Sequence, residues 1–165
     1  MANIMNRTAA SRYIRTIVLA VLVLTITSAA TAQISAAIEK VWIEYGVRVK
    51  GETGLRIHTK FSIKKALNVG CSIQATIERE DGGILLTKSI GTVYKSDKNV
   101  LVLKTFTPPY DIANYADTKL FVPYWALALK AADPNKMKVT VAISGQNKEF
   151  ANSTLKFNLA LGGAD

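Results

Sequence analysis

The chain has 165 residues, 49% of them hydrophobic, and its 21 lysines and arginines outnumber 12 aspartates and glutamates to give a net charge of +9. This length allows one domain, and the apolar fraction supports a packed core, which excludes disordered, collagen-like and disulfide-scaffold proteins. One cysteine and one histidine cannot form an internal disulfide, a thiolate metal site or the ligand set of a typical zinc enzyme, so we assign no catalytic, cofactor-binding or metal-binding residue.

Residues 1–32 have the pattern of a cleavable signal peptide. Three arginines precede an apolar run from Ile17 to Ile26, and small residues follow up to Ala32. Ten apolar residues fall short of the about 20 that span a bilayer, and Cys71 lies too far along the chain to carry a lipid anchor. We expect cleavage after Ala32, leaving one domain over 33–165 in the periplasm or outside the cell, with no transmembrane helix. Without the three arginines, 18 basic side chains face 12 acidic ones.

From Val41 onward the apolar residues recur with a period of two, which is typical of half-buried strands. An opening strand is expected over 41–49, and the clearest strand covers 54–64. Its inward face carries Leu55, Ile57, Thr59, Phe61 and Ile63, and its outward face carries Arg56, His58, Lys60, Ser62 and Lys64. The same alternation over 69–78 predicts a strand that ends in a hairpin turn at 80–83, with residues 84–87 running back.

Further strands are predicted in the second half of the chain. A hairpin at 96–99 should join short strands over 92–94 and 100–106, because Asp and Asn favour turns. Strands are also expected near 120–122, over 137–144 and over 155–161. The segment 124–134 fits either a short helix or a strand buried on both faces, and Pro134 ends it.

Eight or nine strands with turns every 8–12 residues predict an all-β fold. We expect an antiparallel β-sandwich of immunoglobulin-like or related topology.

The lone histidine and the lone cysteine have simple structural interpretations. His58 is flanked on its face by Arg56 and Lys60, and no nucleophile lies beside it in the sequence, so a solvated or edge histidine is favoured over a catalytic base. Cys71 falls on the apolar face of its strand, where a buried free thiol is expected, with intermolecular pairing as the lesser alternative.

Loop aspartates invite a calcium hypothesis. Asp81, Asp97, Asp111 and Asp117 show neither a D-x-D spacing nor a twelve-residue calcium loop, so turn chemistry accounts for most of them. Asp111 and Asp117 form the pair to test first, because they flank one expected loop.

Two surfaces are candidates for binding. The first is a basic stripe on the early strands, which suits anionic glycans, lipopolysaccharide or phospholipid headgroups, or is simply a solvated face. Its residues are Arg48, Lys50, Arg56, Lys60, Lys64 and Lys65. Nucleic acid is not expected as a partner, because the stripe has no aromatic stacking positions.

The second candidate surface is the segment 106–125, which concentrates aromatic residues and prolines. Exposed aromatic rings on a long loop can stack on sugars. The alternative, which we favour, is that Tyr110, Tyr115, Tyr124 and Trp125 close the end of the sandwich and hold the loop down.

Several motifs together resemble a family of exported bacterial β-sandwich modules. These are a tryptophan-led first strand, G-x-x-I-H-x-x-F, F-x-P-x-Y and Y-x-D-x-x-L-F-x-P-Y. The matching residues are Trp42, Gly54, Ile57, His58, Phe61, Phe106, Pro108, Tyr110, Tyr115, Asp117, Leu120, Phe121, Pro123 and Tyr124. The resemblance runs from about residue 41 to 143 and implies the fold, not an activity. This chain departs from the pattern at Tyr45, where other members have histidine, and at Trp125, where they have an acidic residue.

Together these features favour a secreted, non-enzymatic interaction or structural module. Its partner is expected to be an envelope glycan, an anionic polymer or a protein, and the oligomeric state stays open. The alternative is a hydrolase with a shallow site built from His58, Asp111 and Asp117.

Overall fold

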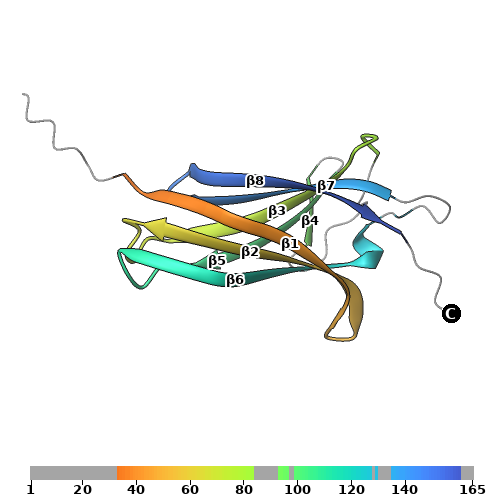
Figure 1. The fold of residues 1–165 in the computed structure, drawn as a ribbon, viewed down its shortest axis with the longest axis horizontal. Helices are drawn as coiled ribbons and strands as arrows, with labels where there is room; N and C mark the ends of the chain where they lie inside the picture. The colour runs from red at the N-terminus through yellow and green to blue at the C-terminus, as the bar shows by residue number, and fades with distance from the viewer. Residues whose placement is uncertain (1–32, 84–92, 97–98, 128, 130–134, 161–165) are drawn as a thin grey trace, which may run out of the picture. The chain divides into compact units, whose positions relative to one another are not determined.

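The computed structural model describes residues 33–83, 93–96, 99–127, 129 and 135–160, which form two antiparallel β-sheets packed face to face (Figure 1). The first sheet has the order β1-β2-β6 and the second β4-β5-β3-β7-β8. The strands are β1 (Ser35–Val49), β2 (Glu52–Lys64), β3 (Cys71–Arg79), β4 (Val93–Ser96), β5 (Asn99–Phe106), β6 (Ile112–Pro123), β7 (Asn135–Gly145) and β8 (Lys148–Leu159).

The chain passes between the sheets after β2, after β5 and after β6. Immunoglobulin-like sandwiches use crossings of this Greek-key kind. The predicted all-β sandwich is therefore confirmed, with eight strands in the described part of the chain.

The core lies between the inner faces of the two sheets. Leu55, Ile57, Phe61 and Ile63 of β2 are at most 1% exposed, which confirms the predicted inward face. The predicted apolar face of β3 is also buried, from Cys71 to Ile77. Alternation produces this result because successive side chains of a strand point to opposite faces of the sheet.

The segment 106–125 is mostly strand, and its prediction as a long loop was wrong. Only residues 107–111 separate β5 from β6, and β6 then pairs with β2 from Ile112 to Pro123. The aromatic residues and prolines that suggested a loop belong to an edge strand and its flanks, and the polar residues of this strand lie mostly on its outer face. Asp111 and Asp117 therefore do not flank one loop, because Asp117 lies within β6.

The three-stranded sheet has two distinct ends. At one end Lys64 pairs with both Ser35 and Ile112, so β1 begins, β2 ends and β6 begins there. We call it the Tyr110 end. At the opposite end Gly54 pairs with Pro123, and β6 continues into a short 3-10 helix, η1 (Tyr124–Ala126).

Other predicted elements are found with altered bounds. β1 begins before residue 41, β8 begins before residue 155, and β4 and β5 form the expected second hairpin. The segment 124–134 begins as η1, and residues 128 and 130–134 lie outside the described residues, as do 1–32 and the returning strand expected at 84–87. In the part of the chain that the structure describes, no helix is long and apolar enough to cross a membrane.

Candidate functional site

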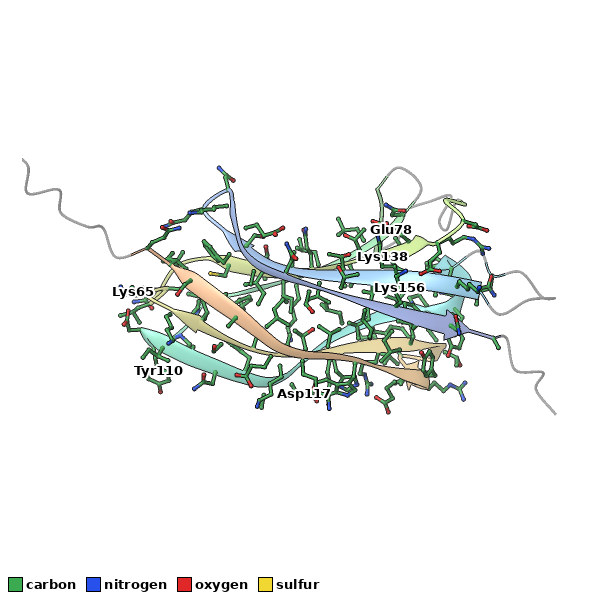
Figure 2. All side chains as sticks on the ribbon, turned by 45° about the horizontal axis from the view of Figure 1, so that its top comes forward. Lys65, Glu78, Tyr110, Asp117, Lys138 and Lys156 are labelled. Carbon is green, nitrogen blue, oxygen red and sulfur yellow. The ribbon has the colours of Figure 1, made fainter. Side chains whose placement is uncertain are left out.

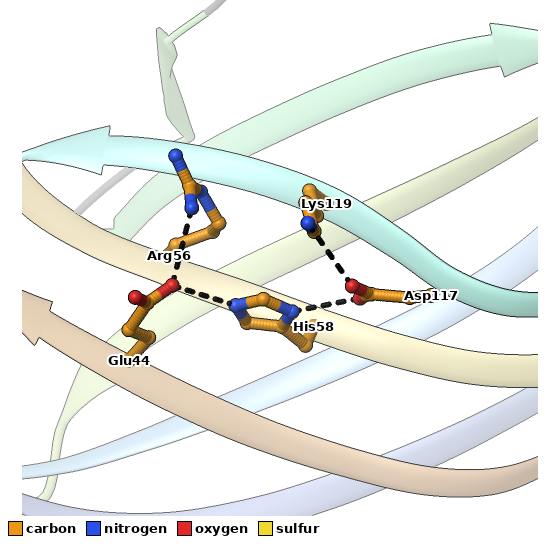
Figure 3. A network of polar contacts seen from close by, with 5 residues as sticks. All are labelled: Glu44, Arg56, His58, Asp117 and Lys119. Carbon is orange, nitrogen blue, oxygen red and sulfur yellow. Dashed lines mark hydrogen bonds and ion pairs between the residues drawn. The ribbon is translucent and has the colours of Figure 1, made fainter. Parts of the chain in front are cut away.

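A charged cluster lies on the outer face of the β1-β2-β6 sheet, and His58 is at its centre (Figure 3). Nδ1 of His58 lies 2.7 Å from Oδ1 of Asp117, and Nε2 lies 3.1 Å from Oε2 of Glu44. Arg56 donates to the same Glu44 oxygen at 3.1 Å, and Lys119 lies 3.2 Å from Asp117. The cluster therefore links the three strands side by side through charged hydrogen bonds.

A β-bulge places Asp117 in this cluster. Thr59 pairs with Thr118 and Phe61 pairs with Tyr115, so two residues of β6, Ala116 and Asp117, oppose the single residue between them on β2. Without the extra residue, strict alternation from Tyr115 would point Asp117 into the core. The bulge turns it outward toward His58, as bulges commonly do when they redirect a side chain.

The prediction of a solvated or edge histidine was wrong, because His58 is buried on β2, the middle strand of its sheet. His58 is only 6% exposed, and its ring stacks on Trp42 with centroids 4.8 Å apart and planes 19° apart. Neighbours on the adjacent strands cover the ring, although His58 is on the outward face as predicted. Lys40 in turn lies 5.3 Å from the centroid of the Trp42 ring, a cation–π distance.

The pKa values of both carboxylates respond to this arrangement. The hydrogen bond from His58 is the main reason that the pKa of Glu44 is lowered, with Arg56 contributing and partial desolvation opposing. Burial acts to raise the pKa of Asp117, but the hydrogen bonds from His58 and Lys119 outweigh it and the net shift is downward. The folded chain therefore stabilises the ionised forms of both groups.

Acid should weaken the fold through these two groups. A carboxyl whose pKa is lower in the folded chain contributes stability above its unfolded pKa and loses it as the pH falls through the folded value. The Glu and Asp side chains of the unfolded chain have pKa values of about 4. We therefore expect the urea midpoint of the wild-type chain to decrease as the pH is lowered from about 5 to about 3. The double variant Glu44→Gln/Asp117→Asn should lose less stability across this pH range. Equal pH slopes for the two chains would contradict the assignment.

In the described part of the chain, the predicted basic stripe is neutralised only at Arg56 and Lys60. Arg56 pairs with Glu44, and Lys60 lies 2.7 Å from Glu39, because acidic residues of β1 face the cations of β2. Arg48 lies near the end of β1 and Lys50 lies in the β1–β2 hairpin turn, away from these two ion pairs. Exposed ion pairs of this kind contribute little to stability, but they leave less net charge for an anionic partner.

The residues proposed for a hydrolase are not brought together. Asp117 contacts His58, but Asp111 precedes β6 at the Tyr110 end, six residues away along an extended segment, or about 20 Å. Both ring nitrogens of His58 already contact a carboxylate and the ring is buried, so neither nitrogen faces an open site where a substrate could bind.

Among the described residues, no group of three or more His, Cys, Asp or Glu side chains is arranged to hold a metal ion. The loop aspartates described there therefore do not form a cation site. Asp81 instead accepts two hydrogen bonds from Arg79, at 2.9 and 2.8 Å. It also accepts one from the backbone of Gly83, which is the turn chemistry that was predicted. Asp97 lies outside the described residues.

Cys71 is 4% exposed and is a free thiol, as predicted. Burial raises the pKa of this thiol, which disfavours the reactive thiolate. A hollow of about 460 Å³ lies beside it, lined by Gly70, Cys71, Ser72, Thr105, Phe106, Thr107 and Gly145. Because its lining holds no charged side chain, this hollow brings no acid or base to the thiol.

The aromatic residues of 106–125 divide into two groups. Tyr115 stacks on Phe61 at 4.6 Å, and the hydroxyl of Tyr124 accepts a 2.8 Å hydrogen bond from the backbone of Gly46. These two tyrosines close the sandwich as predicted. Tyr110 and Trp125 do not, because they are 70% and 47% exposed.

Tyr110 belongs to an exposed surface at its end of the sheet. Leu67 is 49% exposed and Ile112 57% exposed, and the charged residues beside them are Lys64, Lys65 and Asp111. Figure 2 shows Lys65 and Tyr110 at the same end of the sandwich. We call these five residues, Lys64, Lys65, Leu67, Tyr110 and Ile112, the Tyr110 surface. The sequence pattern missed Leu67 and Ile112, because a single apolar residue in or beside a loop carries no periodic signal.

Comparison with known proteins identifies no family for the chain. No family model matches the chain, and no curated protein matches it. Among solved structures, the chain is similar to the solution structure of a protein described as late embryogenesis abundant (LEA). The two share 15% identity with a TM-score of 0.38, over 92% of this chain and 85% of that chain.

Proposed function

We propose that the chain is an exported, non-enzymatic interaction module that binds a component of the cell envelope through the Tyr110 surface. The proposal also assigns the chain to the family of exported β-sandwich modules that its motifs resemble. The observation that carries it is the contrast between two surfaces of one sheet. The charged face satisfies its own groups, whereas the Tyr110 surface exposes three large apolar side chains that nothing in the described chain covers.

Exposed apolar side chains are common singly, but a group of them marks an interaction site. Tyrosine suits such a site because its ring contributes apolar contact and its hydroxyl forms hydrogen bonds. An envelope glycan, an anionic polymer and a protein partner each offer groups for apolar contact and for hydrogen bonds. The hydrolase alternative is less favoured, because His58 is fully engaged and Asp111 is distant from it.

Binding to separated envelope fractions tests the proposal. We expect the exported chain to bind at least one of the membrane, glycan or released-protein fractions, and Tyr110→Ser to weaken that binding by about tenfold. Because apolar contact is not screened by salt, part of the binding should persist as the ionic strength is raised. Tyr45→Ser is the matched control, since Tyr45 is 48% exposed but lies toward the opposite end.

Two results would overturn the proposal. One is equal binding by the wild-type chain and Tyr110→Ser. The other is hydrolysis of an envelope fraction that His58→Ala abolishes, which would establish the enzymatic alternative.

A further inference from the structure

We propose that the Tyr110 surface docks on an anionic lipid surface, an inference that rests on the proposed function and names its partner. The surface combines the three kinds of side chain that suit a membrane interface. Leu67 and Ile112 are aliphatic, Tyr110 is an amphipathic ring, and Lys64 and Lys65 carry positive charge on long apolar stems.

The backbone segments that carry Leu67 and Tyr110 are hydrogen-bonded to each other. The backbone N–H of Lys65 donates to the carbonyl of Asp111 at 2.6 Å, and that of Asn68 donates to the carbonyl of Pro108 at 3.0 Å. These bonds join the β2–β3 loop to the β5–β6 loop, so Leu67 and Tyr110 lie on facing segments.

The loops that carry the Tyr110 surface are anchored by buried residues that are close in sequence to the exposed ones. Ala66 is fully buried beside Leu67, and Pro108 is buried two residues before Tyr110. Ile112 is fixed by its pairing with Lys64 at the start of β6. The surface is therefore formed before any ligand arrives, which keeps the entropy cost of docking small.

The charges favour an anionic partner. Lys64 and Lys65 are exposed, and neither has an ion-pair partner among the residues that the structure describes, in contrast to Arg56 and Lys60. Asp111 is the carboxylate that lies beside them, and its backbone carbonyl, not its side chain, bonds to Lys65. Basic residues next to exposed apolar side chains attract anionic headgroups while the apolar groups enter the interface.

The course of the chain favours a lipid over a glycan or a protein. β1 begins at Ser35, which pairs with Lys64, so the chain enters the domain at this end. Eight residues separate Ser35 from the apolar run that ends at Ile26, a reach of at most about 30 Å. During the proposed export, until cleavage after Ala32, this end is therefore the one that is tethered near the bilayer.

Vesicle binding by the exported chain, with its N-terminal residue determined, tests the inference. Vesicles of phosphatidylglycerol and phosphatidylcholine should bind the chain on the order of tenfold more strongly than phosphatidylcholine vesicles. The triple variant Leu67→Ser/Tyr110→Ser/Ile112→Ser should lose about tenfold on the anionic vesicles, and Lys64→Gln/Lys65→Gln should remove the preference for anionic lipid. Tyr45→Ser should bind as the wild type does.

The outcomes separate this inference from the function on which it rests. Absence of binding to anionic vesicles, or binding that the triple variant retains, overturns the lipid inference. If Tyr110-dependent capture by a lipid-free glycan or protein fraction persists, the partner is of that class and the proposed function stands. Loss of both kinds of binding overturns both.

Discussion

Replacing Gly54 by alanine should destabilise the chain by at least about 3 kcal/mol. A Cβ atom at this position would lie 2.2 Å from the carbonyl oxygen of Val122 and 2.7 Å from Cα of Pro123. Both are backbone atoms of the neighbouring strand, so no side-chain rotation relieves the overlap. The end of β6 would have to separate from β2, which explains a glycine at the first position of the G-x-x-I-H-x-x-F motif.

Gly70→Ala is the matched control, because a Cβ atom there would have no neighbour within 4 Å. We expect this variant to be neutral or slightly stabilised, since alanine reduces the freedom of the unfolded chain. Urea unfolding of both variants and the wild type measures the difference. A Gly54→Ala midpoint equal to that of Gly70→Ala would show that β6 does not pass as close as described.

The second large effect is expected for Phe61→Ala, at about 3–5 kcal/mol. The Phe61 ring is 1% exposed, stacks on Tyr115 and lies 5.6 Å from Phe106 at 59°. Tyr115 and Phe106 also contact each other edge to face at 5.1 Å. Truncation would remove the central ring of this cluster and leave a cavity between the two sheets.

Phe61→Leu should cost less than half as much, because leucine fills most of the space and stays in contact with the core. The free energy of unfolding and the near-ultraviolet dichroism of Tyr115 report the change. A loss below about 1 kcal/mol for Phe61→Ala would contradict the burial described for this ring.

The sequence predicted the fold well where the hydrophobic period was unbroken. In β2 and β3 every second residue is apolar except Thr59, and a shift of one residue would invert the whole pattern, so the buried face was fixed. The pattern in β6 changes phase between Tyr115 and Leu120, because Ala116 and Asp117 form the bulge. That change of phase was the signal in the sequence for a bulged strand. A search for strict alternation treats the same change as the end of a strand and therefore predicts a loop.

The site at His58 was not predictable in the same way. Its partners Glu44 and Asp117 lie 14 and 59 residues away, on strands whose register determines which side chains meet. The cations at Arg56 and Lys60 are near in sequence and pointed to an exposed, repelled histidine. Their charges are met instead by carboxylates of β1, which only the pairing of β1 with β2 reveals.

We propose that the Tyr110 surface, and not the charged face of the same sheet, makes the contact with the envelope. Binding to the responsive envelope fraction should be compared for Tyr110→Ser and Lys60→Gln, two substitutions on exposed side chains of this sheet and its loop. We predict about a tenfold loss for Tyr110→Ser and little change for Lys60→Gln, whose partner Glu39 is also exposed. The reverse result, with binding lost by Lys60→Gln and kept by Tyr110→Ser, would contradict the account.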